Sequence, residues 1–171
     1  MASTYTTRNG IELIGTGEQS GTWGDTTNTN LEIIDRALSG VGTIDLSGSG
    51  AAHTLTTTDG TLTDGMYRLL VLSGATEACT ITVAPNDAQK IYFVYNNSGQ
   101  SCVFSQGSGS NVTIANGDTK FIYCDGAGAG AAVSDFTANL AMSSVNISGG
   151  AISGITDLAI ADGGTGASTV S

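Results

Sequence analysis

Hydrophobic and polar residues alternate along most of the chain between Val41 and Phe136. Nine short segments follow this pattern, at residues 41–46, 53–58, 67–72, 78–83, 90–96, 101–105, 111–115, 119–124 and 131–136. Successive side chains of a strand point to opposite faces of its sheet, so a period of two predicts strands with one buried face. Pairs such as Asn116-Gly117 separate the segments and suit tight turns. Strands at intervals of about 8 to 12 residues predict an antiparallel β-sandwich or barrel.

Two of these segments, YRLLVL at 67–72 and KIYFVYN at 90–96, are apolar on both faces. That pattern is typical of strands at the centre of a sheet. Cys79, Cys102 and Cys124 each keep the phase of the apolar residues around them, which predicts small buried side chains on strands. They form no CxxC pair, so neither a zinc site nor a disulfide framework is indicated.

One short helix is predicted over residues 31–39. Thr29 and Glu32 have the spacing of a capping box, and Gly40 stands where a left-handed helix terminus is wanted. The apolar residues at helical spacing form one stripe, made of Leu31, Ile34 and Leu38. A helix of this length is marginal in isolation, so we expect the stripe to pack on something.

Trp23 precedes that helix in a glycine-rich segment, which predicts a loop position. A loop tryptophan either folds back on its own helix or anchors a partner, because tryptophan is enriched in the hot spots of interfaces. The pattern alone leaves both uses open.

Residues 137–171 contain no Lys, Arg or aromatic residue, and their apolar residues are spaced by Gly, Ser and Asn. The aliphatic set includes Leu140, Met142, Val145, Ile147, Ile152, Ile155, Leu158 and Ile160. Burying such a side chain gains about 1.5 to 3 kcal/mol, whereas ordering each residue's backbone costs about 1 to 2 kcal/mol. We therefore expect this segment either to stay flexible or to intertwine with copies of itself.

The charge balance argues against several classes of partner. The net charge is −10, and the five Lys and Arg residues are scattered singly along the sequence, so we expect neither nucleic acid nor a membrane as a partner. The first residues lack the apolar centre of a secretory signal, which predicts use without export. His53 is the only histidine and has no acid or nucleophile beside it in the sequence. We accordingly expect no enzyme activity, no cofactor and no metal site.

Three stretches resemble tail fibre proteins of tailed bacteriophages, particularly those of marine and cyanobacterial hosts. NGIELIGTGEQSGTWGDTTNTNLEIIDRAL at 9–38 is similar to their N-terminal region. KIYFVYNNSGQ at 90–100 and NVTIANGDTKFIYCDG at 111–126 are similar to the β-domain that follows. VNISGGAISGITDLAIADGGTGAST at 145–169 resembles the glycine-rich shaft repeat of many phage fibres.

The resemblance implies a homotrimeric virion protein of the phage tail, synthesised in the host cytoplasm. It divides the chain into an N-terminal attachment segment (1–40), a β-domain (41–136) and an intertwined trimeric shaft (137–171). The expected trimer axis consists of Val145, Ile147, Ile152, Ile155, Leu158 and Ile160. Docking on a tail tube, adaptor or baseplate protein is assigned to Trp23, Leu31, Ile34 and Leu38. Family members generally continue beyond the GGTGAST segment into a distal domain. The chain is therefore expected to be a short fibre or an adaptor for a distal fibre or receptor-binding protein, or else part of a longer chain.

Two other functions remain open at this point. A carbohydrate-binding β-sandwich would display Tyr92, Tyr95 or Tyr123 for stacking on sugars, although their apolar strands favour core positions. A head fibre or decoration protein would use the same plan of trimer and shaft on a capsid.

Overall fold

The computed structural model describes residues 2–138, which belong to a compact unit spanning Met1–Leu140; a second unit spans Ala141–Ser171. The residues predicted to form the shaft and the trimer axis, from Val145 to Ile160, lie outside the described part. The predicted attachment segment and the β-domain lie together in the first unit.

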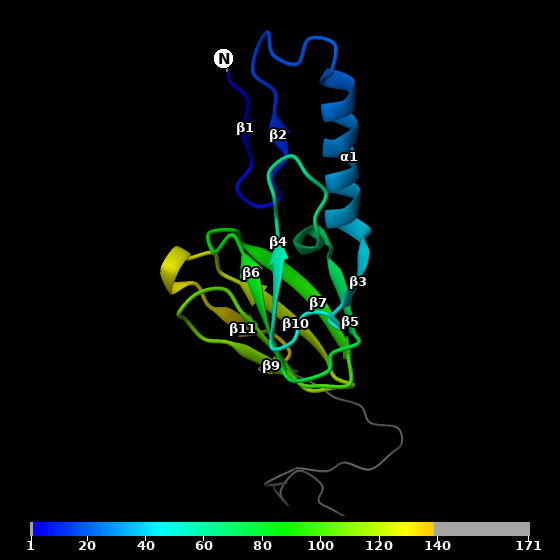
Figure 1. Cartoon of the computed structure of the whole chain (residues 1–171). Helices are drawn as coiled ribbons and strands as arrows, with labels where there is room; N and C mark the ends of the chain where they lie inside the picture. Colours follow the sequence, from blue (N-terminus) through cyan, green and yellow to red (C-terminus); the bar gives the residue numbers. More distant parts are fainter. Residues whose placement is uncertain (1, 139–171) are drawn as a thin grey trace, which may run out of the picture. The chain divides into compact units, whose positions relative to one another are not determined.

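The described part is mainly β with one α-helix (Figure 1). The N-terminal region contains the short strands β1 (Thr4–Tyr5) and β2 (Glu12–Leu13) and the helix α1 (Trp23–Ser39). Nine strands follow, namely β3 (Val41–Asp45), β4 (Ala52–Thr56), β5 (Leu69–Ser73), β6 (Cys79–Ala84), β7 (Lys90–Asn97), β8 (Cys102–Ser105), β9 (Val112–Ile114), β10 (Thr119–Cys124) and β11 (Val133–Asp135). The 3₁₀ turns η1 (Asp64–Met66) and η2 (Gly128–Gly130) interrupt the connections. Each of the nine predicted strands is thus confirmed as an element.

The nine strands form two facing sheets. The five-stranded sheet has the order β11-β10-β7-β5-β3, and the four-stranded sheet has the order β4-β6-β8-β9. The chain alternates between the two sheets from β3 to β8. β9 then follows β8 in the four-stranded sheet, and β10 and β11 complete the five-stranded sheet. As predicted, the doubly apolar segments form β5 and β7, which lie inside the larger sheet.

The predicted antiparallel direction is wrong for four of the seven strand pairs in the two sheets. β3, β5 and β7 pair in parallel, as do β4, β6 and β8, while β8–β9, β7–β10 and β10–β11 are antiparallel. Alternation predicts which face of a strand is buried, but it carries no information on the direction of the neighbouring strand. Parallel neighbours need a crossover, and here each crossover is a strand of the opposite sheet.

The helix also differs from the prediction. It begins eight residues earlier, after Thr22, so Trp23 is its first residue rather than part of a loop, and Thr29 lies inside it. Threonine and asparagine are poor helix formers, but burial of Ile33 and contacts to β2 outweigh this local preference. Gly40 is extended, with φ −69° and ψ 134°, and not left-handed as predicted. Glycine suits this position because a Cβ there would lie 2.4 Å from the Arg36 carbonyl oxygen.

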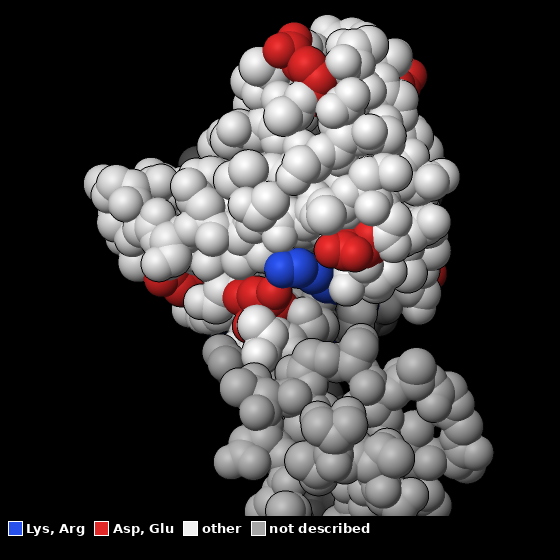
Figure 2. All heavy atoms as spheres, turned by 90° about the horizontal axis from the view of Figure 1, so that it is seen from below, with Lys and Arg blue, Asp and Glu red and all other residues white. Residues whose placement is uncertain are grey.

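Charged side chains are sparse on the surface. Seen from below, acidic groups lie apart from one another around a basic patch, on an otherwise uncharged surface (Figure 2). Lys120 Nζ lies 2.8 Å from Asp135 Oδ2 on this unit. Burial alone would raise the pKa of Asp135, but hydrogen bonds from Lys120 and Thr137 lower it to about 2. Lys120 is therefore a cation that has its own counterion.

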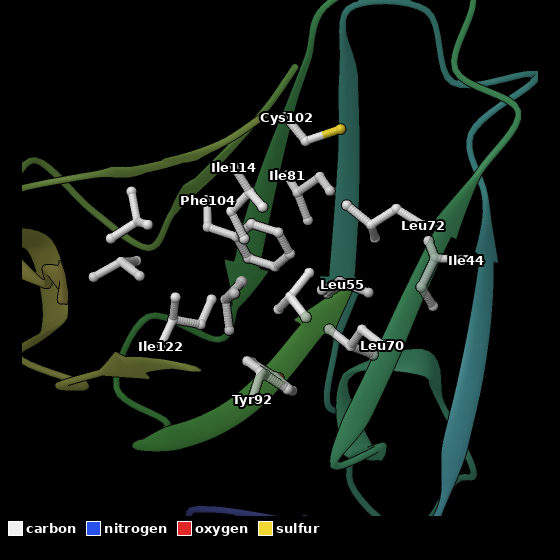
Figure 3. Packing of buried hydrophobic residues seen from close by; sticks show 14 of the residues in the cluster. Ile44, Leu55, Leu70, Leu72, Ile81, Tyr92, Cys102, Phe104, Ile114 and Ile122 are labelled. Carbon is white, nitrogen blue, oxygen red and sulfur yellow. The ribbon is translucent and has the colours of Figure 1, made fainter. Parts of the chain in front are cut away.

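The core lies between the two sheets and takes side chains from both. Figure 3 shows Leu70, Leu72 and Tyr92 of one sheet facing Leu55, Ile81 and Phe104 of the other. The three cysteines, on β6, β8 and β10, are buried and unbridged as predicted. This core fixes which side chains of each sheet point outward.

Candidate functional site

The helix α1 has one side turned toward the protein. Ile33 is fully buried, and Asn30 is hydrogen-bonded to the backbone of Glu12, accepting from its N–H at 2.9 Å and donating to its carbonyl at 2.8 Å. Near the other end of α1, the Arg36 guanidinium lies over the Tyr67 ring, 4.5 Å from its centroid. These contacts hold α1 against β2 and against the segment after η1.

The predicted docking residues lie on a neighbouring side of α1, about 80° to 160° around the helix from Ile33, and are exposed. Their exposed fractions are 62% for Trp23, 58% for Leu31, 39% for Ile34 and 66% for Leu38. At 3.6 residues per turn, the four positions fall within an arc of about 80°. The structure therefore brings them together in a single apolar line, which we call the helix stripe. Leu31 also lines a pocket with Val41, Leu62 and Tyr67.

The outer face of the five-stranded sheet carries a second apolar surface, which the sequence did not reveal. The strand register aligns one row of residues across the sheet. Phe136, which directly follows β11, joins this row because its N–H donates to the Phe121 carbonyl. The row is formed by Val41, Leu69, Phe93, Phe121 and Phe136. The rings of Phe93 and Phe121 stack with centroids 4.7 Å apart, and those of Phe121 and Phe136 are 5.5 Å apart.

The rows on either side extend this surface. Thr43, Val71, Tyr95 and Thr119 form one, and Ile91, Tyr123 and Ser134 form the other. We call these three rows the aromatic face. None of its residues is charged, and Val41 (59%), Ile91 (43%), Phe93 (40%), Tyr95 (39%) and Phe136 (49%) remain substantially exposed.

The outer face of the four-stranded sheet has a different composition. Its outward positions are mainly threonines, namely Thr54, Thr56, Thr80, Thr82 and Thr113. A polar outer face is the ordinary arrangement for a sheet with one solvated side. The aromatic face is therefore a property of one sheet and not of the fold.

The three tyrosines considered for sugar stacking separate into two groups. Tyr92 is 1% exposed and donates a hydrogen bond from its hydroxyl to the Gly65 carbonyl at 2.8 Å, so it belongs to the core. Tyr95 and Tyr123 lie on the aromatic face, with Tyr123 half-buried. Apolarity on both faces of β7 thus has two causes, a core side and an exposed apolar side.

Cations that are scattered in the sequence meet at one pocket. Arg8, Arg68 and Lys90, three of the five Lys and Arg residues, line a pocket of about 250 Å³ at the end of the five-stranded sheet. Their positions lie up to 82 residues apart along the chain, so no sequence pattern could show the grouping.

His53 lies nearer to other functional groups than the sequence indicated. Ser49 Oγ is 3.0 Å from its Nδ1, and Asp64 Oδ2 is 3.9 Å from its Nε2. The latter distance is too long for a hydrogen bond, and Nε2 has no such partner within residues 2–138. A catalytic triad needs the acid bonded to the histidine, and this trio lacks that contact.

Residues 2–138 contain no group of three or more His, Cys, Asp or Glu residues placed to hold a metal ion. No helix among them has the length and apolarity required to cross a membrane. Comparison of the chain with protein-family models, with curated proteins and with solved structures finds no match.

Proposed function

We propose that this chain is a structural virion protein, a bacteriophage tail fibre or fibre adaptor. It docks on the tail through α1 and assembles as a homotrimer that projects toward the host. The observation that carries the proposal is that a folded chain leaves two ordered apolar surfaces uncovered, the helix stripe and the aromatic face. The sequence resemblance to phage fibres supplies the biological setting.

The size of these surfaces supports a role in assembly. Aromatic side chains cover about 150 to 250 Å² each, so the exposed fractions leave on the order of 1,000 Å² open over both surfaces together. A typical soluble monomer exposes a largest apolar patch of about 300 to 600 Å², and a standard interface buries about 800 Å² per partner. Since that total is divided between two surfaces, each is comparable with the largest apolar patch of a typical monomer, and this chain carries two of them.

We assign the two surfaces to different partners. The helix stripe, with its exposed tryptophan, has the composition of an interface hot spot and docks on a tail tube, adaptor or baseplate protein. The aromatic face contains no Asp or Glu although the chain has a net charge of −10, so copies of the chain meet there without bringing acids together. Trimerisation through residues 137–171 is the second contact between copies.

Stripe variants test the docking assignment. Trp23→Ala combined with Leu38→Ala is expected to reduce the fibre content of purified particles at least about tenfold, since truncating a hot-spot residue costs about 2 kcal/mol or more. Trimer formation by the free protein should be unchanged. Glu32→Ala, also exposed on α1 but outside the stripe, is the matched control and should be incorporated normally.

Quantitative mass spectrometry of the particles measures the outcome. If the doubly substituted fibre is present at wild-type stoichiometry, α1 is not the attachment element. Cross-linking of intact virions also distinguishes a tail fibre from a head fibre, because α1 would cross-link to a capsid protein in the latter.

Exposure of Tyr95 and Tyr123 favours one runner-up, a carbohydrate-binding module. Sugar sites combine aromatic rings with converging polar groups, whereas the rows around these tyrosines are dominated by phenylalanine and aliphatic residues. A glycan array with the wild type and with Tyr95→Ala distinguishes the two, since a lectin that binds sugars through this face loses binding in the variant, whereas the pocket described below does not contain Tyr95.

A further inference from the structure

The pocket at the end of the five-stranded sheet is unusual in its charge. Arg8, Arg68 and Lys90 line it, and none of the described residues around it is acidic. The chain has 15 Asp and Glu residues against five Lys and Arg. Asp87 lines a neighbouring pocket together with Arg8 and Gln89, but no carboxylate lines this one.

Each of the three cations is held by a neutral group. Arg8 donates from Nε and Nη2 to Gln89 Oε1, at 3.3 and 2.8 Å, and Lys90 Nζ donates to Asn9 Oδ1 at 2.6 Å. The Arg68 guanidinium lies 5.9 Å from the centroid of the Phe93 ring. Within residues 2–138, none of the three forms an ion pair with a carboxylate.

This arrangement is costly without an anion. Lys90 is only 7% exposed, and a buried charge without a counterion is unfavourable. Burial lowers the pKa of Lys90 to about 8, so the amine remains mainly protonated at pH 7. By contrast, Lys120 outside the pocket has Asp135 as its counterion.

The remaining lining groups suit a small hydroxylated ring. Tyr67 and Tyr123 supply aromatic surface, while Asn9 and Gln89 supply amides for hydrogen bonding. Gln89 Nε2 already donates to the Tyr123 hydroxyl at 3.4 Å, which links the polar side of the pocket to its aromatic side. A volume of about 250 Å³ admits one sugar-sized ring and is small for larger ligands.

We propose that this pocket binds an acidic monosaccharide unit, with its carboxylate at Arg8, Arg68 and Lys90 and its ring against Tyr67 and Tyr123. Arginine recognises carboxylates through paired N–H donors, and aromatic rings pack on the apolar face of a sugar. The proposal does not depend on the role of α1. Tyr123 also belongs to the aromatic face, so binding requires that this end of the face stays uncovered when copies associate.

Calorimetric titration of the full 171-residue chain with glucuronic acid tests the proposal. We expect saturable binding, with glucose at least tenfold weaker because it lacks the carboxylate. Free glutamate carries a carboxylate without the ring and is expected to bind more weakly than glucuronic acid. Equal binding of glutamate would assign the pocket to acidic peptides and overturn the sugar assignment.

Single-charge variants locate the binding. Arg68→Gln and, independently, Arg8→Gln are each expected to weaken glucuronic acid binding at least about tenfold, because a hydrogen bond to a charged group is worth about 1.5 to 3 kcal/mol. Lys120→Gln removes the same charge outside the pocket and should change affinity less than about twofold. Circular dichroism confirms that each variant is folded. Absence of saturable binding to the wild type, or equal loss in Lys120→Gln, would overturn the proposal.

Discussion

Asn96 shows how one polar residue holds several segments together. It is fully buried on β7, and its Nδ2 donates to the carbonyls of Gln100 and Ile114, both at 2.8 Å. Its Oδ1 accepts from the backbone N–H of Ser98 at 3.1 Å and from the Ser98 hydroxyl at 2.7 Å. The side chain therefore ties the β7–β8 turn to the end of β9.

Replacing Asn96 should destabilise the fold strongly. Asn96→Ala leaves buried carbonyl groups without donors, each at a cost of about 1 to 3 kcal/mol, so we expect the free energy of unfolding to fall by about 2 to 4 kcal/mol. The neighbouring Asn97 is exposed, and Asn97→Ala should change it by less than about 0.5 kcal/mol. Urea unfolding measures both, and equal effects would show that the Asn96 hydrogen bonds are not stabilising.

Lys90 is expected to make stability depend on pH. Its pKa falls from 10.5 to about 8 on folding because of burial, opposed by Cys124 nearby. Between these values the unfolded chain holds the proton more tightly, so the Lys90 contribution to stability rises with pH from about 8 to 10.5. Below about pH 8 the buried charge opposes folding, by up to about 3 kcal/mol for a shift of this size.

Lys90→Met tests this contribution directly. The variant should be more stable than the wild type at pH 7, and the difference should shrink as pH rises above about 8. Thermal unfolding at several pH values measures the difference. A variant that is less stable at pH 7, or a difference independent of pH, would contradict the burial cost.

At the residue scale, the sequence predicted environments well and groupings poorly. Burial of the three cysteines followed from the phase of their neighbours and is confirmed. The meeting of Arg8, Arg68 and Lys90 was not predictable, because it depends on how the segment after β1 lies against the start of β7. Exposure of the helix stripe also required the structure, since an apolar stripe has the same sequence pattern whether it is covered or not.

At the scale of elements, each strand is read from its own residues, while its pairing depends on others. Alternation identified β3 to β11 because burial of one face is written locally in every strand. It did not distinguish a parallel neighbour from an antiparallel one, and the prediction of direction failed for β3 to β8. Likewise α1 extends to Trp23 because Asn30 contacts Glu12, a tertiary contact that local propensity cannot anticipate.

The two sheets also provide a matched test of self-association. Phe93 on β7 and Thr80 on β6 both point outward from inner strands, one on the aromatic face and one on the threonine-rich face. Phe93→Lys should weaken association between copies at least about tenfold, because it places a charge in the buried centre of the interface. Thr80→Lys should leave association unchanged.

Sedimentation velocity over a range of concentrations compares these two variants with the wild type. If both lysines weaken association equally, the effect comes from charge in general and not from the aromatic face. Hydroxyl-radical footprinting adds a direct readout, since Tyr95 and Phe136 should lose reactivity as the wild-type chain associates.

At the scale of the whole molecule, strands β3 to β8 wind in successive coils, each made of one strand from each sheet. The coils repeat without a visible repeat in the sequence. Val41 pairs with Leu69 in one sheet and Ala52 with Thr80 in the other, so the first coil advances the register by 28 residues. The next coil pairs Leu69 with Phe93 and Thr80 with Val103, offsets of 24 and 23. Unequal coil lengths conceal the repeat from any search at a fixed period.

These coils create two outer faces. The face of the four-stranded sheet is threonine-rich, and the face of the five-stranded sheet is aromatic. A chain that needed only to remain soluble would have two polar faces. The combination of the aromatic face and the helix stripe therefore marks a component of an assembly.

Native mass spectrometry of the full chain tests that claim most directly. We expect a homotrimer, with a mass three times that of the 17.1 kDa chain. In Phe93→Lys we expect the mass distribution to shift to smaller species. A wild-type chain that remains at the mass of a single copy throughout the accessible concentration range would contradict it.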